Sequence, residues 1–212
     1  MADPDTYPTH DTYLTIARAS RAELKEKASR FIAEAFPVST PEEADTRIRE
    51  VRKREYNATH VCSAWRVGAE ADEFRSNDDG EPSGSAGAPI LRHIEGRGLT
   101  NVLVTVTRYY GGTKLGTGGL IRAYGDAASQ ALDDAGVRRV VRRVPLTLSF
   151  DYDDTSPAMH VISMFDATIG DTRYDERTHI TVHVRLGDRK ALEAAFVEAL
   201  GGRGDLGAQA GG

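Results

Sequence analysis

The sequence has a single cysteine, Cys62, among its 212 residues. One thiol cannot form an internal disulfide, so the sequence is not that of a disulfide-stapled secreted domain, and we expect a cytoplasmic location. The chain also has no apolar run near the ~20 residues that a membrane-spanning helix needs. Residues 1–5 lack the basic and apolar segments of a signal peptide. We therefore expect no membrane association.

The sequence also lacks an excess of positive charge. It has 27 Lys and Arg residues against 32 Asp and Glu residues, a net charge of −5. A protein that is basic over its whole surface is thereby excluded, so any contact with a polyanion must be local. Arginine far outnumbers lysine, a bias that suits either a GC-rich genome or a salt-adapted organism.

The most informative stretch is the glycine-rich run of residues 108–125, between a strand-like and a helix-like segment. It carries the cationic side chains of Arg108, Lys114 and Arg122. Its glycine spacing matches neither the P-loop nor the dinucleotide-binding fingerprint. Backbone N–H groups, a helix N-terminus and nearby cations favour an anion, so we interpret the run as a phosphate or polyanion site. The alternative is a tight turn that needs glycine but binds nothing.

The residue patterns predict an α+β protein. Residues 102–107 form the strongest strand pattern, apolar enough to be central in a sheet. Residues 120–135 repeat alanine and leucine at helical spacing. Thr40 to Glu43 is a helix start with a capping box and a proline in the first turn. Residues 23–36 fit a helix or a strand, and the pattern leaves both open.

The second half of the sequence reads β-α-β-β-α, an order that suits a ferredoxin-like unit with a short or missing last strand. Four arginines within residues 138–143 precede this unit. They lie either on a solvent-exposed strand face or on an edge that contacts phosphate. We predict domains at residues 13–143 and 144–202, and a flexible glycine-rich tail at residues 203–212. Asp188 is expected to cap the last helix.

His60 and Cys62 lie on one face of a predicted strand, ahead of a turn-rich loop at residues 77–87. Three interpretations are open: a zinc site, a Cys–His hydrolase, or a buried polar pair under the loop. A zinc site needs more ligands than this pair supplies, and we expect neither a metal nor an organic cofactor. The acidic side chains of the loop are expected to form salt bridges with the arginines opposite and so to order it.

Three segments together resemble the IMPACT/YigZ family. The first is residues 27–33, the second joins residues 58–64 to residues 78–87, and the third is residues 108–124. Three motifs in this order are far more specific than one glycine-rich loop. The resemblance extends over most of the chain.

The resemblance implies a fold for each domain and a role in translation. The N-terminal domain would have the ribosomal-protein-type fold also found in GHMP kinases, and the C-terminal domain would be ferredoxin-like. Residues 23–36 would then be strand-like. Eukaryotic relatives regulate translation by interfering with activation of an initiation-factor kinase, through an extra protein-binding domain that we do not find in this sequence. For prokaryotic relatives, binding to nucleic acid or the ribosome is the usual suggestion.

We therefore favour a non-catalytic, translation-associated factor that binds RNA or the ribosome, with a protein partner as a further possibility. Aromatic side chains would stack on bases while the cations contact phosphate. The expected contact residues are Arg108, Tyr109, Tyr110, Gly111, Gly112, Lys114, Gly116, Gly118, Gly119 and Arg122. The expected partners across the site are His60, Cys62, Asp78, Asp79, Glu81 and Ser83.

The alternative is an enzyme acting on a phosphorylated small molecule or nucleotide. In that hypothesis Asp78 or Asp79 serves as a base or metal ligand, with help from His60.

Overall fold

The computed structural model describes residues 11–207 as two compact units, each with its own hydrophobic core. The first unit is residues 13–140, and the second is residues 141–207 together with Asp11 and Thr12. Both units combine helices and strands, so the α+β prediction is confirmed. Residues 1–10 and the last five residues of the predicted tail lie outside the described part. No helix within residues 11–207 is both long and apolar enough to cross a membrane.

A five-stranded antiparallel sheet forms the base of the first unit. In spatial order its strands are β2 (Ser20–Glu26), β3 (Ser29–Pro37), β6 (Val102–Tyr109), β4 (His60–Val67) and β5 (Glu73–Asn77). Strand β6 is central, as its apolar run predicted. A separate two-stranded sheet pairs β1 (Thr12–Ile16) with β7 (Val137–Val141).

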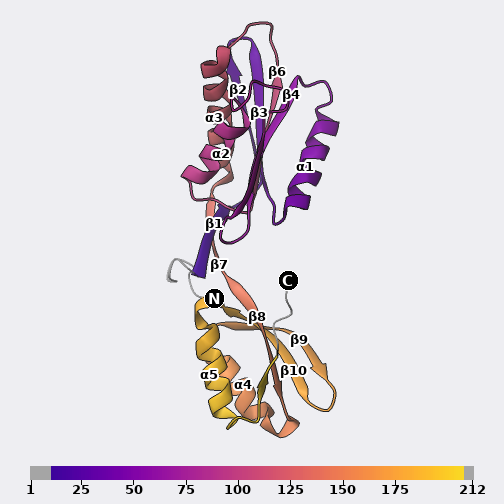
Figure 1. Ribbon diagram of the computed structural model, residues 1–212, viewed down its shortest axis with the longest axis vertical. Helices are drawn as coiled ribbons and strands as arrows, with labels where there is room; N and C mark the ends of the chain where they lie inside the picture. Colours follow the sequence, from indigo (N-terminus) through magenta and orange to yellow (C-terminus); the bar gives the residue numbers. More distant parts are fainter. Residues whose placement is uncertain (1–10, 208–212) are drawn as a thin grey trace. The chain divides into compact units, whose positions relative to one another are not determined.

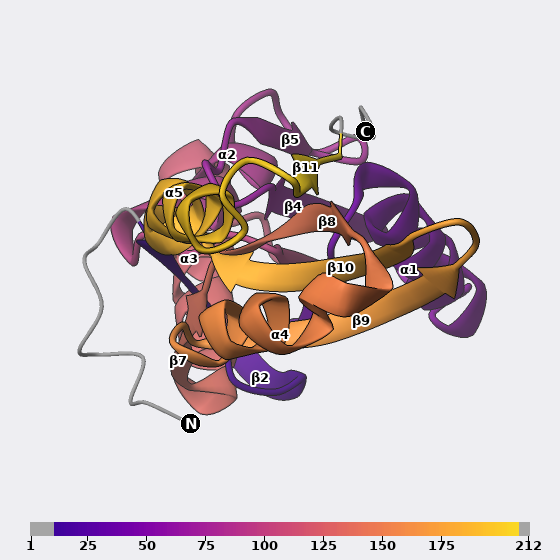
Figure 2. The same ribbon diagram turned by 90° about the horizontal axis from the view of Figure 1, so that it is seen from below.

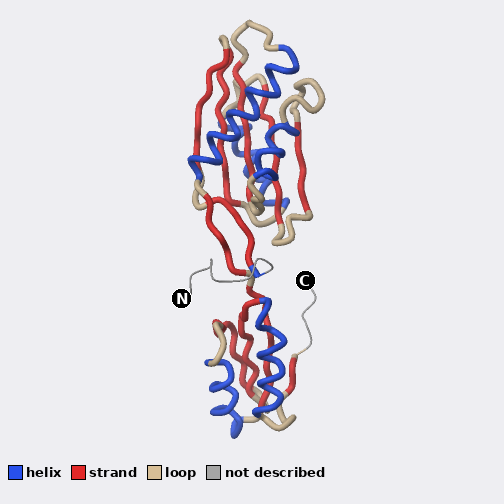
Figure 3. The backbone as a smooth tube through the Cα atoms, turned by 90° about the vertical axis from the view of Figure 1, so that its left-hand side faces the viewer, coloured by secondary structure: helices blue, strands red, loops and turns tan. Residues whose placement is uncertain are grey.

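Helices cover both faces of the five-stranded sheet. Helix α1 (Pro41–Arg54) lies on one face, and α2 (Gly87–Gly96) and α3 (Gly116–Ala135) lie on the other (Figure 1). Figure 3 has the α3 face toward the viewer, and α3 crosses the strands diagonally there. Successive side chains of a strand point to opposite faces, so each strand residue is assigned to α1 or to α2 and α3 by its parity.

Two cores follow from this alternation. Phe31, Cys62 and Val104 point toward α2 and α3, where they pack with the alanine-rich stripe of α3. Trp65 and Leu103 point the other way and form a smaller core under α1. Strand β6 therefore contributes to both cores.

The segment that we left open between helix and strand consists of strands, as the family resemblance implied. Residues 20–26 and 29–37 form the hairpin of β2 and β3, which turns at Lys27 with a φ of 51°. Helical spacing was misleading because Phe31 is buried against α3 and Ile32 is buried on the opposite face, which gives a continuous apolar run. Strand β5 was not predicted at all, because every one of its residues is exposed and it carries no apolar alternation.

The predicted start of α1 is confirmed. The Thr40 hydroxyl accepts the Glu43 backbone N–H at 3.2 Å, and the Glu43 carboxylate accepts the Ser39 N–H at 2.7 Å. In α5 (Arg189–Ala199), Asp188 stands at the predicted N-cap position, but without a side-chain cap bond. The Asp188 carboxylate makes no cap bond there and pairs with Arg185 instead.

The second unit is a four-stranded antiparallel sheet packed against two helices (Figure 2). Its elements are β8 (Arg143–Phe150), α4 (Thr155–Ser163), β9 (Ala167–Tyr174), β10 (Thr178–Arg185), α5 and β11 (Asp205–Leu206), with strand order β11-β8-β10-β9. The first part of the predicted tail is not loose, because Arg203 pairs with Asp154 at 2.8 Å and β11 extends the sheet edge. Of the arginines in residues 138–143, Arg143 pairs with Asp166 at 2.7 Å.

Two glycines of the run play opposite roles in this fold. A Cβ on Gly111 would lie 1.8 Å from the Ala28 carbonyl oxygen in the β2–β3 turn, whereas a Cβ on Gly118, inside α3, meets nothing closer than 3.9 Å. We expect Gly111→Ala to lower the free energy of unfolding by about 2 kcal/mol or more, because backbone must move. Gly118→Ala should raise it by up to about 1 kcal/mol through helix propensity. Urea denaturation followed by circular dichroism measures both, and an equally stable Gly111→Ala protein would contradict the close approach.

Candidate functional site

A pocket of about 400 Å³ lies between the loop of residues 78–87 and the glycine-rich run. It is lined by residues of both: Thr59, His60, Glu81, Pro82, Arg108, Tyr110, Lys114, Leu115, Gly116, Thr117 and Leu120. The two motifs, far apart in the sequence, are thus the two walls of one site within the first unit.

A buried ion pair forms the floor of this pocket. The Arg108 guanidinium donates to Glu81 Oε1 at 2.6 Å, and the two side chains are only 6% and 4% exposed. The Tyr124 hydroxyl donates to the same oxygen at 2.7 Å. Arg108 also lies over the rings of Phe31 and Tyr110, at 5.5 and 5.3 Å from their centroids. Arg108 is therefore buried and held in an internal ion pair, although its Nε has no hydrogen-bond partner among the described residues, and its expected contact with phosphate stays a prediction.

Asp78 closes the loop on itself. Its carboxylate accepts the backbone N–H groups of Gly84, Ala86 and Gly87 at 2.8 to 3.0 Å. Burial acts to raise the pKa of Asp78, but these three hydrogen bonds outweigh it and hold the pKa below its usual value. The Asp78 carboxylate therefore anchors the loop through its backbone N–H groups.

Asp79 fastens the same loop to β4. Its carboxylate accepts the Val61 N–H at 2.7 Å and pairs with Arg52 at 2.5 Å. Its backbone carbonyl lies 2.7 Å from His60 Nδ1. Asp79 takes a φ of 46°, a left-handed conformation that aspartate tolerates better than most residues. Both aspartates of the loop thus hold its shape.

Cys62 lies beneath the loop, fully buried, and its thiol donates to the Asp78 carbonyl at 3.0 Å. Burial raises the pKa of this thiol to about 12, and the negative charges of the loop act in the same direction. A nucleophilic cysteine needs the opposite environment, so the Cys–His hydrolase interpretation is wrong. His60 and Cys62 both bond to loop carbonyls, as expected of a polar pair under the loop. Within residues 11–207 no group of three or more metal-binding side chains comes together.

Two exposed cations lie at the glycine-rich run, Lys114 in the pocket lining and Arg122 in the first turns of α3 outside that lining. Lys114 and Arg122 are exposed, and neither makes a hydrogen bond or ion pair with another residue of the range 11–207. Gly112 and Gly116 of the same run take φ values of 88° and 72°, respectively. At both positions the space that a side chain would occupy is open. Helix α3 begins after Leu115 without a side-chain cap, so its first N–H groups are open to a ligand.

The structure separates the predicted residues into three groups. Arg108, Tyr110, Lys114, Gly116, His60 and Glu81 line the pocket; Gly118, Gly119 and Arg122 lie in the first turns of α3; Ser83 is exposed on the loop. Tyr109 points to the opposite sheet face, where its hydroxyl donates to Glu55 at 2.7 Å. Tyr124, near the end of the glycine-rich run, is fully buried. Strand alternation across residues 108–110 is the signal that separates Tyr109 from its neighbours.

Sequence reasoning missed part of the lining. Thr59, Pro82, Leu115, Thr117 and Leu120 complete the pocket wall. Leu115 and Thr117 lie inside the glycine-rich run and were passed over because they are neither charged nor glycine. Thr59 could not be identified from the sequence pattern. The fold brings it to the pocket, where its hydroxyl accepts the Tyr110 backbone N–H at 3.0 Å.

The Arg108–Glu81 pair predicts a large effect on stability. Arg108→Ala leaves the Glu81 carboxylate buried without its cation, a change that costs about 3–5 kcal/mol in comparable buried pairs. Urea denaturation measures the loss. Lys114→Ala, at an exposed position of the same run, should change the free energy of unfolding by less than about 0.5 kcal/mol. Similar stabilities for the two variants would contradict a structural role for Arg108.

Cys62 is expected to be unreactive in the folded protein. At about pH 8 the folded thiol, with its pKa raised to about 12, is almost wholly protonated, so iodoacetamide should modify it only after denaturation. The raised pKa also stabilises the fold below about pH 9, and this contribution is lost as the pH rises toward 12. Mass spectrometry of native and urea-treated protein reads the modification. Fast alkylation of the native protein would contradict the burial.

Comparison with known proteins matches both units. The Impact N-terminal domain matches residues 27–132, a range that contains the whole pocket, and a domain of unknown function (DUF1949) matches residues 148–203. The IMPACT family member YvyE of Bacillus subtilis (strain 168) is 36% identical over 196 residues, which are 92% of this chain and 90% of that protein.

A second relative and a solved structure agree with this match. The IMPACT family member YigZ of Escherichia coli (strain K12) is 34% identical over 182 residues, 85% of this chain and 88% of that protein. A crystal structure described as that of a hypothetical protein superposes with a TM-score of 0.73 at 30% identity, covering 94% of this chain and 98% of that one. The resemblance read from the three motifs is confirmed, and the chain belongs to the IMPACT family.

Proposed function

We propose that this protein is a non-catalytic factor of translation that binds RNA or the ribosome through the pocket at the glycine-rich run. The observation that carries the proposal is the pair of exposed cations, Lys114 and Arg122, beside the uncapped start of α3. Cations without an internal partner, next to free backbone N–H groups, suit phosphate groups.

The pocket also offers a surface for a base. Tyr110 is 44% exposed, and its ring lies against the Arg108 guanidinium on its inner side. The outer side of the ring is thereby held in place to stack on a base. Such stacking contributes strongly to the binding of single-stranded RNA and tolerates different base sequences. Leu115 and Leu120 give the rest of the wall an apolar character that suits bases better than water.

Membership of the IMPACT family supports a role in translation, since the resemblance implies that role for the eukaryotic relatives. We further propose the cytoplasm as its location. A binding role is favoured over the enzymatic alternative because Asp78 and Asp79, the residues that the enzyme hypothesis needs, hold the loop through backbone hydrogen bonds.

We also propose specific fold relationships for the two units. The strand order β11-β8-β10-β9, with helices α4 and α5 after the first and third strands of the unit, supports the ferredoxin-like assignment. The mixed unit of residues 13–140 supports a ribosomal-protein-type domain related to GHMP kinases. The predicted domain limits of 143 and 202 stay part of this proposal.

The test removes the two exposed cations together. Lys114→Gln with Arg122→Gln should weaken binding to structured RNA and ribosomes by roughly tenfold, since exposed ion contacts contribute up to about 1 kcal/mol each. The slope of log affinity against log salt should fall by about 1.4 to 1.8, because two phosphate contacts are lost. Filter binding over a salt series and ribosome cosedimentation measure both quantities.

A matched control makes the same change of charge elsewhere. Arg47→Gln with Lys53→Gln removes two exposed cations from α1 on the other face of the sheet. This variant should bind as the unmodified protein does. Unchanged affinity in the Lys114 and Arg122 variant, or an equal loss in the control, would refute the proposal.

A further inference from the structure

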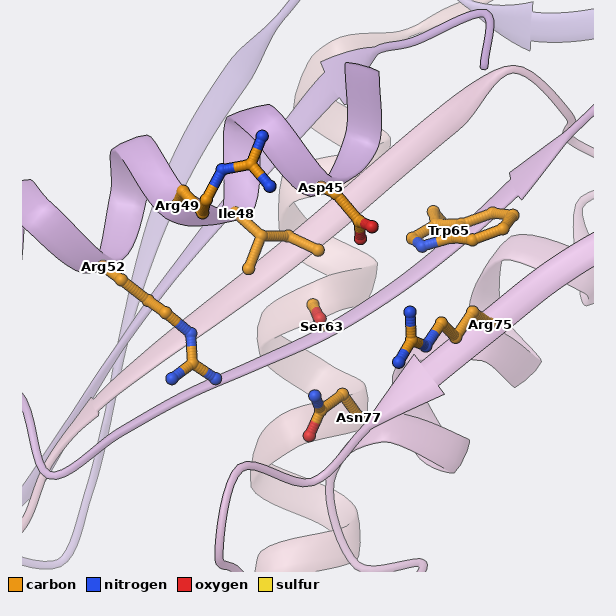
Figure 4. Close-up of a pocket in the computed structure, with 8 residues that line it drawn as sticks. All are labelled: Asp45, Ile48, Arg49, Arg52, Ser63, Trp65, Arg75 and Asn77. Carbon is orange, nitrogen blue, oxygen red and sulfur yellow. The ribbon is translucent and has the colours of Figure 1, made fainter. Parts of the chain in front are cut away.

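A second pocket lies on the other face of the five-stranded sheet, between α1, strand β4 and the edge strand β5. Its volume is about 260 Å³, and the residues that line it include Asp45, Arg49, Arg52, Trp65, Arg75 and Asn77 (Figure 4). None of these residues lines the pocket at the glycine-rich run.

The fold brings these side chains together by simple periodicity. Trp65 and Arg75 are direct cross-strand partners in the β4–β5 ladder and share the sheet face under α1. Asp45, Arg49 and Arg52 follow one another at spacings of four and three on α1, which places them on one helix side. In Figure 4 the labelled side chains of α1 lie along one side of the pocket and those of β4 and β5 lie along the other.

Three guanidinium groups gather at this pocket. Arg75 is exposed and makes no hydrogen bond or ion pair with any other residue of the described chain. The Arg49 guanidinium donates to the Thr46 hydroxyl at 2.9 Å and pairs with no carboxylate, while Arg52 pairs with Asp79. Asp45 contributes the one carboxylate among the lining residues. The pocket therefore has an excess of positive charge. Its guanidinium groups are planar, and their paired donors match the oxygens of a phosphate.

The Trp65 indole N–H is a buried donor without an acceptor. Trp65 is 6% exposed, and its Nε1 has no hydrogen-bond partner among the residues described. A buried donor left unpaired costs about 1–3 kcal/mol, so it needs an explanation. In Figure 4 the ring nitrogen lies on the pocket side, facing Asp45. A donor directed into a cationic pocket indicates a ligand rich in hydrogen-bond acceptors.

We propose that this pocket binds a small phosphomonoester that carries a hydroxyl group, of the size of a sugar phosphate. Arg49 and Arg75 hold the phosphate, with Arg52 beside them, and the indole N–H of Trp65 supplies a further donor. The Asp45 carboxylate, which has no partner among the described residues, accepts a hydrogen bond from the hydroxyl. The volume lies just under the roughly 300 Å³ at which pockets for larger ligands begin, so a small ligand fits best.

The chain supplies its own reporter for this site, because Trp65 is its only tryptophan. Ribose 5-phosphate is the probe, with inorganic phosphate and ribose as comparisons at constant ionic strength. We expect ribose 5-phosphate to change Trp65 fluorescence with saturation in the millimolar range or below, inorganic phosphate to do so more weakly, and ribose to have no effect.

Variants assign the response to the pocket. Arg75→Gln should weaken ribose 5-phosphate binding about tenfold or more, the loss expected for one charge-assisted hydrogen-bonded contact. Arg47→Gln on the outer side of α1 and Arg122→Gln at the glycine-rich run are matched controls and should leave the titration unchanged. Asp45→Asn should weaken ribose 5-phosphate but not inorganic phosphate. Trp65→Phe, measured by calorimetry, should weaken both.

Three results would overturn the inference. One is the absence of any saturable fluorescence change with either phosphate compound. Another is an equal loss in Arg75→Gln and Arg47→Gln, which would make the effect one of net charge alone. Equal binding of inorganic phosphate and ribose 5-phosphate would refute the assignment of Asp45 to a hydroxyl. Because RNA binding is tested at Lys114 and Arg122, this inference and the proposed function stand or fall separately.

Discussion

The buried pair of Arg108 and Glu81 is the interaction on which the candidate site depends. Arg108 comes from the central strand, Glu81 from the acidic loop, and Tyr124 from α3 adds its hydroxyl to the same carboxylate oxygen. Three segments far apart in the sequence are thereby joined at one atom. Both members of the pair are buried, and removing either one leaves an uncompensated charge in the interior.

Around this pair the charged residues divide into two kinds. Arg108, Asp78 and Asp79 are committed to internal partners and give the pocket its shape. Lys114 and Arg122 have no such partner in the described chain and leave the surface cationic there. A net charge of −5 is compatible with an anion site because only local, uncompensated cations act on a ligand, while distant charges are screened.

The five-stranded sheet presents a different chemistry on each face. Alternation along β4 sends Cys62 toward α3 and Trp65 toward α1, and alternation along β6 separates Arg108 from Tyr109 in the same way. The two pockets described above lie on opposite faces as a result. Asp79 lies between them, since its carboxylate bonds to Arg52 on the α1 side and its carbonyl lies against His60 on the α3 side.

The sequence by itself determined the central strand, the long alanine-rich helix, the start of α1 and the family, because periodicity, capping and motif order are local properties of the chain. It also indicated that the acidic loop would form salt bridges with the arginines opposite. Only the tertiary structure decided which arginine is buried and which cation is free, because that depends on which side chain reaches a carboxylate 27 positions away in the sequence. It likewise decided the hairpin of β2 and β3 and the exposed strand β5, whose pairing rests on neighbours that no local pattern identifies.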